Sequence, residues 1–469
     1  MEIIGRNIEK NILLDALSST QSEMIAVYGR RRVGKTFLIE HVFENKICFN
    51  ISGIHKGSMK DQLNEFSKIL FPKKKERQEI TNWFDAFDLL EAHVETVKGK
   101  QKKVIFIDEL PWLDTPKSKF LAAFEHFWNT WASKRTDIIL VVCGSAASWM
   151  IKKILNSKGG LHNRVTIRIR LLPFNLDETE QYLKTKNIRL NRYDLCQLYM
   201  SMGGIPFYLK QIRRSESVIQ NIERICFTKD GLLYNEFDNL YAALFNNAAK
   251  HIALINALAN SPQGLNRNML IKNSKLATGG GISDVLNELI ESGFVTQVSP
   301  QNTLAKNNMF RLTDEYSLFY LKFIQQNKFA GQGSWTSLSK TQSYTTWCGY
   351  AFENICFKHT NEIKKALGIA AVFSNIHSWH NAKAQIDMLI DREDNCINMC
   401  EIKYSKSEFE INKNYDTKLR TKVDAYQNDV KTNKNLFVTF ITSKGLKENM
   451  YKTNLVHNSI TLDDLFYSQ

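Results

Sequence analysis

No stretch of the sequence is apolar for long enough to cross a lipid bilayer, which argues against an integral membrane protein. The first residues, MEIIGRNIEKNILLDAL, carry charges throughout and lack the apolar centre of a signal peptide. The eight cysteines never form a CxxC pair, so the common zinc and redox motifs built on that pair are absent. We therefore expect reduced thiols and a cytoplasmic protein that has no membrane partner.

Acidic residues are scarce relative to basic ones. The 469 residues include 62 Lys and Arg but only 48 Asp and Glu, which gives a formal net charge of +14. This excess predicts a polyanionic partner, with nucleic acid, above all DNA, ahead of an anionic membrane surface. The alternative is a basic solvated surface without a partner. A hydrophobic fraction of 43% is ordinary for globular chains, and the length suggests about three domains.

The strongest local signal is MIAVYGRRRVGKTFLIEHVF, residues 24–43. Its apolar start predicts a strand, its end predicts a helix, and the loop between them matches GxxxxGK[ST]. Glycines in such a loop let backbone N–H groups reach phosphate oxygens, and the helix N-terminus adds a positive dipole. Lys35 would contact the β- and γ-phosphates, and Thr36 would hold Mg²⁺. The predicted ATP-binding residues are Gly29, Arg30, Arg31, Arg32, Val33, Gly34, Lys35 and Thr36.

A second segment, KKVIFIDELPWL, would complete the nucleotide site. Val104–Ile107 is continuously apolar, as in a buried parallel strand, and Asp108 follows at the strand end where ligands bind in open α/β sheets. Asp108 is thus a predicted Mg²⁺ ligand through water. Glu109 would polarise the attacking water, which favours hydrolysis over binding alone. The alternative for both acids is a simple turn at the end of a strand.

Two further residues near this site have alternative roles. Ser145 follows the apolar run Ile138–Cys143, where its hydroxyl would sense the γ-phosphate or cap a helix over residues 146–155. Arg164 precedes another strand. It would act as an arginine finger on a neighbouring copy in a homo-oligomer, or bond to the edge of the sheet.

Five segments in this order resemble the archaeal- and bacterial-type ATPases in the AAA+/STAND branch of P-loop NTPases: VYGRRRVGKT, VIFIDELPW, CGSAASWM, RIRLLPF and GGIPFYL. The resemblance covers residues 1–230 and implies a five-stranded parallel sheet with the phosphate-loop strand at its centre. It also implies a small helical lid from Asn175 to Cys226. Within that lid the Gly-Gly-x-Pro segment would lie near the nucleotide and link its state to the next domain. Alternatively, Pro206 only starts a helix.

Residues 231–330 show three short helical patterns separated by Pro-Gln-Gly and Gly-Gly-Gly, followed by the strand-like segments FVTQV and NMFRL. Three helices followed by a β-hairpin indicate a winged helix. Such domains often place their last helix in the DNA major groove. Here that helix carries Asp284, Glu288 and Glu291, so the pattern favours packing against protein over reading bases.

The C-terminal segment begins with the helical pattern YTTWCGYAFENICFKHTNEIKKAL, which places Glu353 beside an apolar face. An edge strand is expected at Ala371–Phe373, followed by the antiparallel strands QIDMLID and NCINMCEIKYS around a REDN turn. Because side chains alternate along a strand, Glu401 and Lys403 point the same way and Asp387 can face them. Two carboxylates suit Mg²⁺ or Mn²⁺, and the lysine would neutralise a scissile phosphate.

This constellation resembles the PD-(D/E)xK nuclease superfamily over residues 345–469, although Ile386 stands where the family has proline. The resemblance implies metal ligands at Asp387 and Glu401 and catalytic roles for Glu353, Asp387, Glu401 and Lys403. The alternative is a solvated hairpin face. A basic helical segment follows, and it would either grip phosphates or form a solvated face through Lys413, Lys418, Arg420 and Lys422.

The sequence therefore predicts a P-loop NTPase sheet with a helical lid, then a winged helix, then an α/β restriction-endonuclease-like domain. We expect an ATP-binding and ATP-hydrolysing protein that acts on nucleic acid or is regulated by it, with a metal-dependent DNA endonuclease domain. One alternative is a STAND-type regulatory switch whose C-terminal domain binds DNA or protein without cleavage. Another is an adaptor at a membrane surface that uses only the basic charge.

Overall fold

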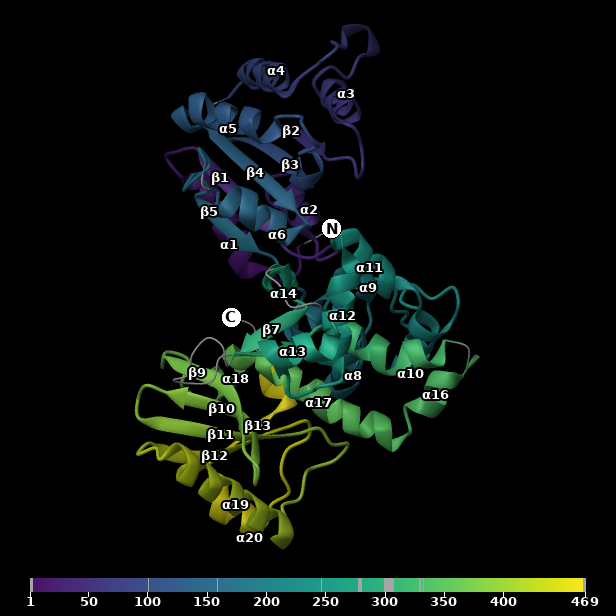
Figure 1. The fold of residues 1–469 in the computed structure, drawn as a ribbon, viewed down its shortest axis with the longest axis vertical. Helices are drawn as coiled ribbons and strands as arrows, with labels where there is room; N and C mark the ends of the chain where they lie inside the picture. The colour runs from purple at the N-terminus through teal and green to yellow at the C-terminus, as the bar shows by residue number, and fades with distance from the viewer. Residues whose placement is uncertain are drawn as a thin grey trace. The chain divides into compact units, whose positions relative to one another are not determined.

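The computed structural model describes residues 3–99, 101–157, 159–245, 247–276, 281–298, 308–328, 330–331 and 333–466. These residues divide into two compact units (Figure 1). The first unit comprises Met1–Leu172 with Glu291–Gly293, and the second comprises Pro173–Ile290 with Phe294–Gln469. The helices that we expected in the lid fall within the second unit. None of the described helices is long and apolar enough to cross a bilayer.

A five-stranded parallel sheet forms the first unit. Its strands are β1 (Glu23–Tyr28), β2 (Ile47–Ser52), β3 (Lys103–Asp108), β4 (Ile138–Gly144) and β5 (Ile167–Arg170). The spatial order is β2-β3-β4-β1-β5, so the parallel sheet predicted from the family resemblance is confirmed. The expected position of the phosphate-loop strand is wrong, however, because β4 occupies the centre and β1 lies beside it.

Helices cover this sheet because its central strands are apolar on both faces: every residue of β3 and β4 is buried. The α-helices are α1 (Asn7–Ser18), α2 (Lys35–Val42), α3 (Met59–Leu70), α4 (Trp83–Thr96), α5 (Phe120–Thr130) and α6 (Ala147–Trp149). A π-helix follows at Met150–Leu155, and short 3₁₀ turns occur at Lys74–Glu76, Leu110–Trp112 and Ala132–Lys134. Figure 1 shows α3, α4 and α5 together on one side, where the aromatic residues Phe66, Trp83, Phe87, Phe120 and Phe127 pack with the strands.

The second unit begins with helices α7 (Leu176–Thr185), α8 (Arg192–Met202), α9 (Pro206–Leu209) and α10 (Val218–Ile222), followed by a π-helix at Glu223–Phe227. Pro206 occupies the first turn of α9, as expected for a residue that starts a helix. A Cβ atom at Gly204 would lie 1.9 Å from the carbonyl oxygen of Phe174, so the chain needs glycine there.

The middle of the second unit combines helices with a small antiparallel sheet of order β6-β8-β7. The helices are α11 (Glu236–Leu244), α12 (Ala248–Ala259), α13 (Arg267–Ser274) and α14 (Gly281–Glu291). The strands are β6 (Leu265–Asn266), β7 (Val295–Val298) and β8 (Met309–Leu312). The helices and the hairpin thus follow the order that the sequence predicts. The chain continues through α15 (Glu315–Phe319), a π-helix at Tyr320–Ile324, a 3₁₀ turn at Gln325–Asn327 and α16 (Ser334–Leu338).

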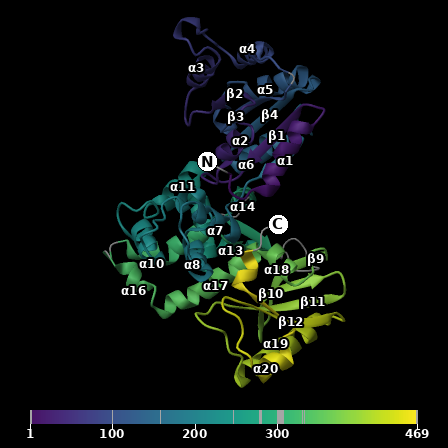
Figure 2. The same ribbon diagram turned by 180° about the vertical axis from the view of Figure 1, so that it is seen from behind.

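The C-terminal part contains a mixed five-stranded sheet of order β13-β12-β11-β10-β9. Its strands are β9 (Ser374–His380), β10 (Gln385–Arg392), β11 (Cys396–Lys403), β12 (Asn435–Thr442) and β13 (Asn458–Thr461). Its helices are α17 (Gln342–Lys358), α18 (Thr360–Ala366), α19 (Lys413–Val430) and α20 (Met450–Leu455), and a 3₁₀ helix spans Leu462–Phe466. Both views show α17 and α18 on one side of the sheet and α19 and α20 on the other (Figures 1 and 2).

The edge strand expected at Ala371–Phe373 is wrong, because those residues form a turn and β9 begins at Ser374. The backbone N–H of Val372 donates to the carbonyl of Ile369 at 3.0 Å, and its carbonyl accepts from Lys364 Nζ at 2.7 Å. These bonds satisfy the N–H and carbonyl of Val372 within the turn, whereas the carbonyl of Phe373 accepts from the N–H of Glu393, directly after β10, at 3.1 Å.

Candidate functional site

The loop between β1 and α2 has a backbone that requires glycine at both ends. Gly29 has a φ of 143°, and a Cβ atom there would lie 2.3 Å from the carbonyl oxygen of Leu171. Gly34 has a φ of 96° directly before α2, in the left-handed region that side chains disfavour. The loop therefore has the glycine-dependent form that brings backbone N–H groups and a helix N-terminus to one anion.

Lys35 is held at the centre of this loop. Its Nζ donates to the carbonyls of Gly29 and Arg30 at 2.9 and 3.0 Å and to Ser145 Oγ at 3.0 Å. The side chain is only 5% exposed. Burial lowers the pKa of its ammonium group, an effect that the nearby Glu109 carboxylate opposes. The hydrogen-bond acceptors around its ammonium group are neutral, and a phosphate at this position would replace them with charged oxygens.

Thr36 and Asp108 come together from α2 and β3. Thr36 Oγ1 donates to Asp108 Oδ2 at 2.7 Å, and the backbone N–H of Glu109 donates to Asp108 Oδ1 at 2.9 Å. Burial raises the pKa of Asp108, whereas the bond from Thr36 opposes that rise. A hydroxyl and a carboxylate at one point are the hard oxygen donors that Mg²⁺ prefers, so these residues fit the expected ion.

Glu109 and Ser145 form a pair at the ends of β3 and β4. The backbone N–H of Ser145 donates to Glu109 Oε2 at 3.0 Å, and its hydroxyl donates to Oε1. The alternative role of Ser145 as a helix cap is wrong, because α6 begins at Ala147 after Ala146 and has no side-chain cap. Ser145 therefore links Lys35 to Glu109, and its predicted contact with the γ-phosphate stays a prediction.

The arginines of the loop and Arg164 lie in different environments. Arg30 is 2% exposed, Arg32 has a φ of 70°, and the Arg31 guanidinium lies 5.7 Å from the centre of the Trp112 ring. Val33 is buried, and its carbonyl accepts from Arg6 Nη2 at 3.4 Å. Arg164 has an exposed side chain in the segment before β5, so its finger role in a homo-oligomer stays a prediction.

Gln62 is a positioning residue that the sequence did not reveal. Its side chain is fully buried in α3, where Oε1 accepts from the N–H of Ile54 at 2.9 Å. Its Nε2 donates to the carbonyls of Ile54 and Trp112 at 2.8 and 3.1 Å. It thereby fastens the segment after β2 to the turn that follows Glu109. A glutamine within a helical pattern gives no signal of such a role.

The strands β10 and β11 bring together the acids and the lysine that the sequence singles out. Lys403 Nζ lies 2.8 Å from Glu401 Oε1 and 3.9 Å from Asp387 Oδ2. Asp387 Oδ2 also accepts from the backbone N–H of Ile402 at 2.9 Å. Asp387 is buried, and burial together with the nearby Glu401 charge raises its pKa. The predicted grouping of these side chains is present in the structure.

Two residues of α19 complete the surroundings of Glu401. Lys422 Nζ lies 2.7 Å from Glu401 Oε2, and the Tyr415 hydroxyl donates to Oε1. Burial alone would raise the pKa of Glu401, but the two lysines hold it below its ordinary value. Lys422 is therefore not on a solvated face, whereas Lys413 and Lys418 are exposed and Arg420 pairs with Asp416 at 2.9 Å.

Glu353 approaches this group from α17. Its pKa is raised to about 7, first by burial and then by the charge of Asp387. Its Oε2 lies 3.6 Å from Nη2 of Arg311, a buried residue of β8 that sequence reasoning did not connect to the site. Among the residues that the structure describes, no group of three or more His, Cys, Asp or Glu side chains is arranged to hold a metal ion.

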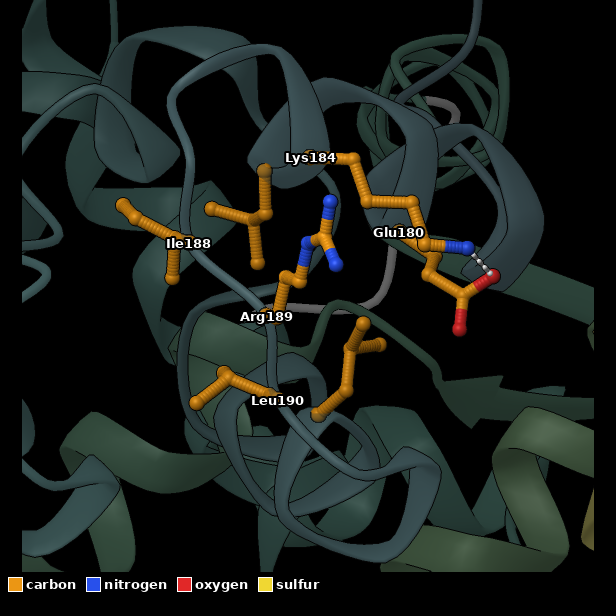
Figure 3. Close-up of a pocket in the computed structure, with 7 residues that line it drawn as sticks. Glu180, Lys184, Ile188, Arg189 and Leu190 are labelled. Atoms are coloured by element: carbon orange, nitrogen blue, oxygen red, sulfur yellow. Dashed lines mark hydrogen bonds and ion pairs between the residues drawn. The ribbon is translucent and has the colours of Figure 1, made fainter.

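A separate cavity of about 260 Å³ lies between α7 and α8 (Figure 3). Its walls are mainly aliphatic, and Lys184 Nζ pairs with Glu180 Oε2 at 2.7 Å across one side. Arg189 points into it from the segment between the helices. None of the residues that we predicted for ATP or metal binding lines this cavity.

Comparison with known proteins assigns two regions of the chain. Residues 4–212 match the model of an ATPase domain found predominantly in Archaea. The N-terminal region is an archaeal-type P-loop ATPase domain. ATP binding is implied for this ATPase domain by its family. Residues 320–415 match a model of archaeal and bacterial proteins of unknown function.

Two relatives and one solved structure are similar to this chain. An uncharacterised protein of Methanocaldococcus jannaschii is 24% identical over 391 residues, which are 82% of this chain and 83% of the relative. An uncharacterised ATP-binding protein of the same archaeon is 22% identical over 272 residues, 48% of this chain and 74% of the relative. A Walker-type ATPase of Pyrococcus abyssi has a similar fold, with a TM-score of 0.51 and 14% identity over 68% of this chain and 96% of that one.

Proposed function

We propose that the ATPase domain hydrolyses ATP with Mg²⁺. The observation that carries this proposal is the 2.7 Å hydrogen bond between Thr36 Oγ1 and Asp108 Oδ2, which joins two oxygen ligands from separate elements. Lys35 lies next to them and would move its hydrogen bonds from the loop carbonyls to phosphate oxygens. When bound, Mg²⁺ neutralises charge on the β- and γ-phosphates.

Glu109 would accept the proton of the attacking water while the new bond between the water oxygen and the γ-phosphorus forms and the bond to ADP breaks. Its two carboxylate oxygens already accept from Ser145, and each retains a lone pair for a further donor. Ser145 would thereby orient the carboxylate toward the nucleotide. This arrangement supports hydrolysis rather than binding alone.

Steady-state ATP hydrolysis tests this proposal in four variants of the full chain. We expect Glu109→Gln to keep nucleotide affinity and to lower kcat on the order of a hundredfold or more, because general-base catalysis contributes that much. Lys35→Ala should lose ATP affinity, and Asp108→Asn should lose Mg²⁺-dependent hydrolysis. Lys10→Ala, an exposed change on α1, is the control. Full activity in Glu109→Gln would reject the assigned base.

We also propose that the C-terminal part cleaves phosphodiester bonds of DNA as a PD-(D/E)xK-like domain. The convergence of Asp387, Glu401 and Lys403 on neighbouring strands, with Glu353 beside them, favours this second function. The donor set has the chemistry for Mg²⁺ or Mn²⁺, but cations of the chain itself lie against these carboxylates in the structure.

Nicking of supercoiled plasmid with Mg²⁺ or Mn²⁺ tests the second function. Asp387→Asn and Glu401→Gln should abolish nicking, and Lys35→Ala should retain it. Asp424→Asn, an exposed acid on α19, is the matched control. Normal ATP hydrolysis without nicking under either metal would instead favour a regulatory switch whose C-terminal domain only binds its partner.

The partner that we propose is DNA, bound through the excess of basic residues. Lys413 and Lys418 are exposed on α19, the helix that also supplies Lys422 to the acid group. Phosphate contacts make affinity fall linearly with the logarithm of salt concentration. Replacing both exposed lysines with glutamine should therefore lower the affinity and flatten its salt dependence. Binding to anionic vesicles but not to DNA would favour the membrane-surface alternative.

We further propose that the helices and hairpin between residues 231 and 330 form a winged helix that packs against protein. Glu288 of α14 accepts from His251 of α12 at 2.8 Å, so part of the acidic face of the last helix is engaged within this region. Acidic residues would repel DNA phosphates, which supports a coupling role for this region between the ATPase domain and the C-terminal domain.

A further inference from the structure

The C-terminal acid group is already balanced by cations of the chain. Its carboxylates belong to Glu353, Asp387 and Glu401, and its cations belong to Lys403, Lys422 and Arg311. Buried charges are costly unless they are paired. A divalent ion would add two positive charges to a group that is already paired, so the cation beside each carboxylate that binds the ion must leave first.

The three cations differ in how easily they can leave. The Lys403 and Lys422 side chains are 28% and 24% exposed, so either ammonium group can turn toward water. The Arg311 side chain is only 5% exposed and lies over the ring of Phe357, with 4.8 Å between its guanidinium carbon and the ring centre. It cannot reach water unless β8 itself moves.

Arg311 can also donate more hydrogen bonds than it does in this structure. Its Nη2 is 3.6 Å from Glu353 Oε2, and its buried Nε has no hydrogen-bond partner within the described part of the chain. A guanidinium with an unsatisfied N–H group gains little from such a position by itself. A role as a temporary counter-ion for the acids explains why a guanidinium occupies this position.

A second contact closes the same side of the site. Gln263, in the segment before β6, donates from Nε2 to Gln385 Oε1 at 2.6 Å at the start of β10. The space enclosed by Gln263, Arg311, Glu353, Trp379, Gln385 and Asp387 is about 10 Å³. That volume is about the space for one water molecule, so it admits no phosphodiester group.

We propose that Arg311 is an autoinhibitory cation that keeps the C-terminal acid site closed until β8 and the Gln263 segment move away together. A divalent ion and a DNA phosphate then enter the space that they vacate. This inference rests on the proposed function of the C-terminal site and adds a mode of regulation to it. Because Arg311 belongs to the middle of the chain, any partner or nucleotide that shifts that region would control cleavage.

Binding of Mn²⁺ to the full chain without nucleotide, measured by the paramagnetic resonance of the free ion, tests the inference. The informative quantity is the binding that Asp387→Asn removes, since this excludes ions held at the phosphate loop. We expect Arg311→Met to bind Mn²⁺ at this site at least tenfold more tightly than the unmodified chain. Arg267→Met is the matched control, because the one side-chain hydrogen bond that Arg267 donates to the described residues is to the hydroxyl of Ser283, at 3.3 Å.

A second pair of variants leaves Arg311 and the acids unchanged. In Gln263→Glu with Gln385→Glu, two carboxylates replace the bonded amides and repel each other, so Mn²⁺ affinity should rise several-fold. Gln263→Glu alone retains a bond to the Gln385 amide and should change little. Gln263 is exposed and Gln385 is half-buried, and neither change alters the buried Arg311, so this pair remains informative if Arg311→Met fails to fold.

Two negative results of the Mn²⁺ binding experiment have different meanings. If the unmodified chain already binds Mn²⁺ at the Asp387-dependent site as tightly as Arg311→Met and the double glutamate variant, the autoinhibitory role is wrong but the metal site stands. If no variant shows binding that depends on Asp387, the proposed metal site itself is wrong, and the inference falls with it.

Discussion

At the scale of single residues, His359 shows how one buried side chain joins two helical segments. Its Nδ1 lies 2.8 Å from the carbonyl of Ile355 in α17, and Nε2 accepts from the backbone N–H of Leu176 at 3.1 Å, at the start of α7. This pattern requires the proton on Nδ1. The residue is 1% exposed, and burial lowers its pKa to about 4.

We predict that this imidazole destabilises the fold as the solution is acidified. The unfolded chain binds a proton near pH 6.5, whereas folded His359 does so only near pH 4. Neutral His359 therefore makes its full contribution to the free energy of unfolding above pH 6.5. This contribution is lost as the pH falls from 6.5 to 4. Between pH 7.5 and 5.5 the loss should be about 1.4 kcal/mol of unfolding free energy, measured by urea denaturation.

The matched variant is His359→Gln, whose amide oxygen can accept from Leu176 without titrating. Other groups, including Glu353, contribute equally to both proteins, so the difference between the two pH profiles isolates the imidazole. Identical profiles would show that folded His359 titrates near its ordinary pKa. His359→Leu should be less stable than His359→Gln at every pH, because it leaves the Leu176 N–H without an acceptor.

Individual site residues were predictable when their neighbours in sequence carried the signal. Lys35 and Thr36 follow from a contiguous loop pattern, and Asp108 follows from an apolar run that ends in an acid. Arg311 and Lys422 were not predictable as members of the C-terminal site, because they lie 42 and 21 residues from their partners Glu353 and Glu401. Only the folded register of strands and helices brings such residues together.

At the scale of elements, continuous apolar runs identified the buried parallel strands, and two apolar segments around a REDN turn identified β10 and β11. The same reasoning misplaced β9, because the apolar run Ala371–Phe373 is a turn in which Phe373 is 63% exposed. The actual strand, Ser374–His380, is polar and lies at the edge of the sheet. An edge strand is covered on fewer sides, so its sequence carries a weaker apolar signal.

Gln62 of α3 holds the backbone of Ile54 and Trp112 in place, and we predict that its loss weakens the first unit. Gln62→Ala leaves the N–H and carbonyl of Ile54 and the carbonyl of Trp112 without their side-chain partner. We expect a loss of about 2–3 kcal/mol in the stability of the first unit, from the cost of buried unpaired groups. The turn after Glu109 should also lose its fixed position, so kcat for ATP should fall more than the affinity for ATP.

Asn64→Ala is the control for this change, because Asn64 is exposed on the same helix. Chemical denaturation and ATPase kinetics on both variants separate the two effects. If Gln62→Ala destabilises the protein without altering kcat at a temperature where it remains folded, Gln62 has a structural role only.

At the scale of the whole molecule, the division after Leu172 was not foreseen, since the resemblance to ATPases extends to residue 230. The helices beyond that point pack within the second unit. There Tyr193 of α8 stacks on Tyr404 with 4.9 Å between ring centres, and Arg192 pairs with Asp463 at 3.2 Å. Such contacts join residues more than 200 positions apart, and no local pattern reports them.

The two units should also unfold separately. The first unit has its own core, in which the large aromatic residues of α3, α4 and α5 pack on one face of the parallel sheet. The C-terminal sheet has cores of its own around Tyr426 and Phe440. We therefore predict two transitions in differential scanning calorimetry of the full chain. With Mg²⁺ and ATP at about a hundred times the dissociation constant, the transition of the first unit should rise by about 5–10 °C.

The second transition should stay in place, because the phosphate loop and Asp108 lie entirely within the first unit. Lys35→Ala should remove the shift without merging the transitions, since its side chain contacts the loop and Ser145 rather than the aromatic core. A single transition that ATP moves as a whole would mean that the two units unfold as one cooperative body. In that case ATP binding would be coupled directly to the stability of the C-terminal site.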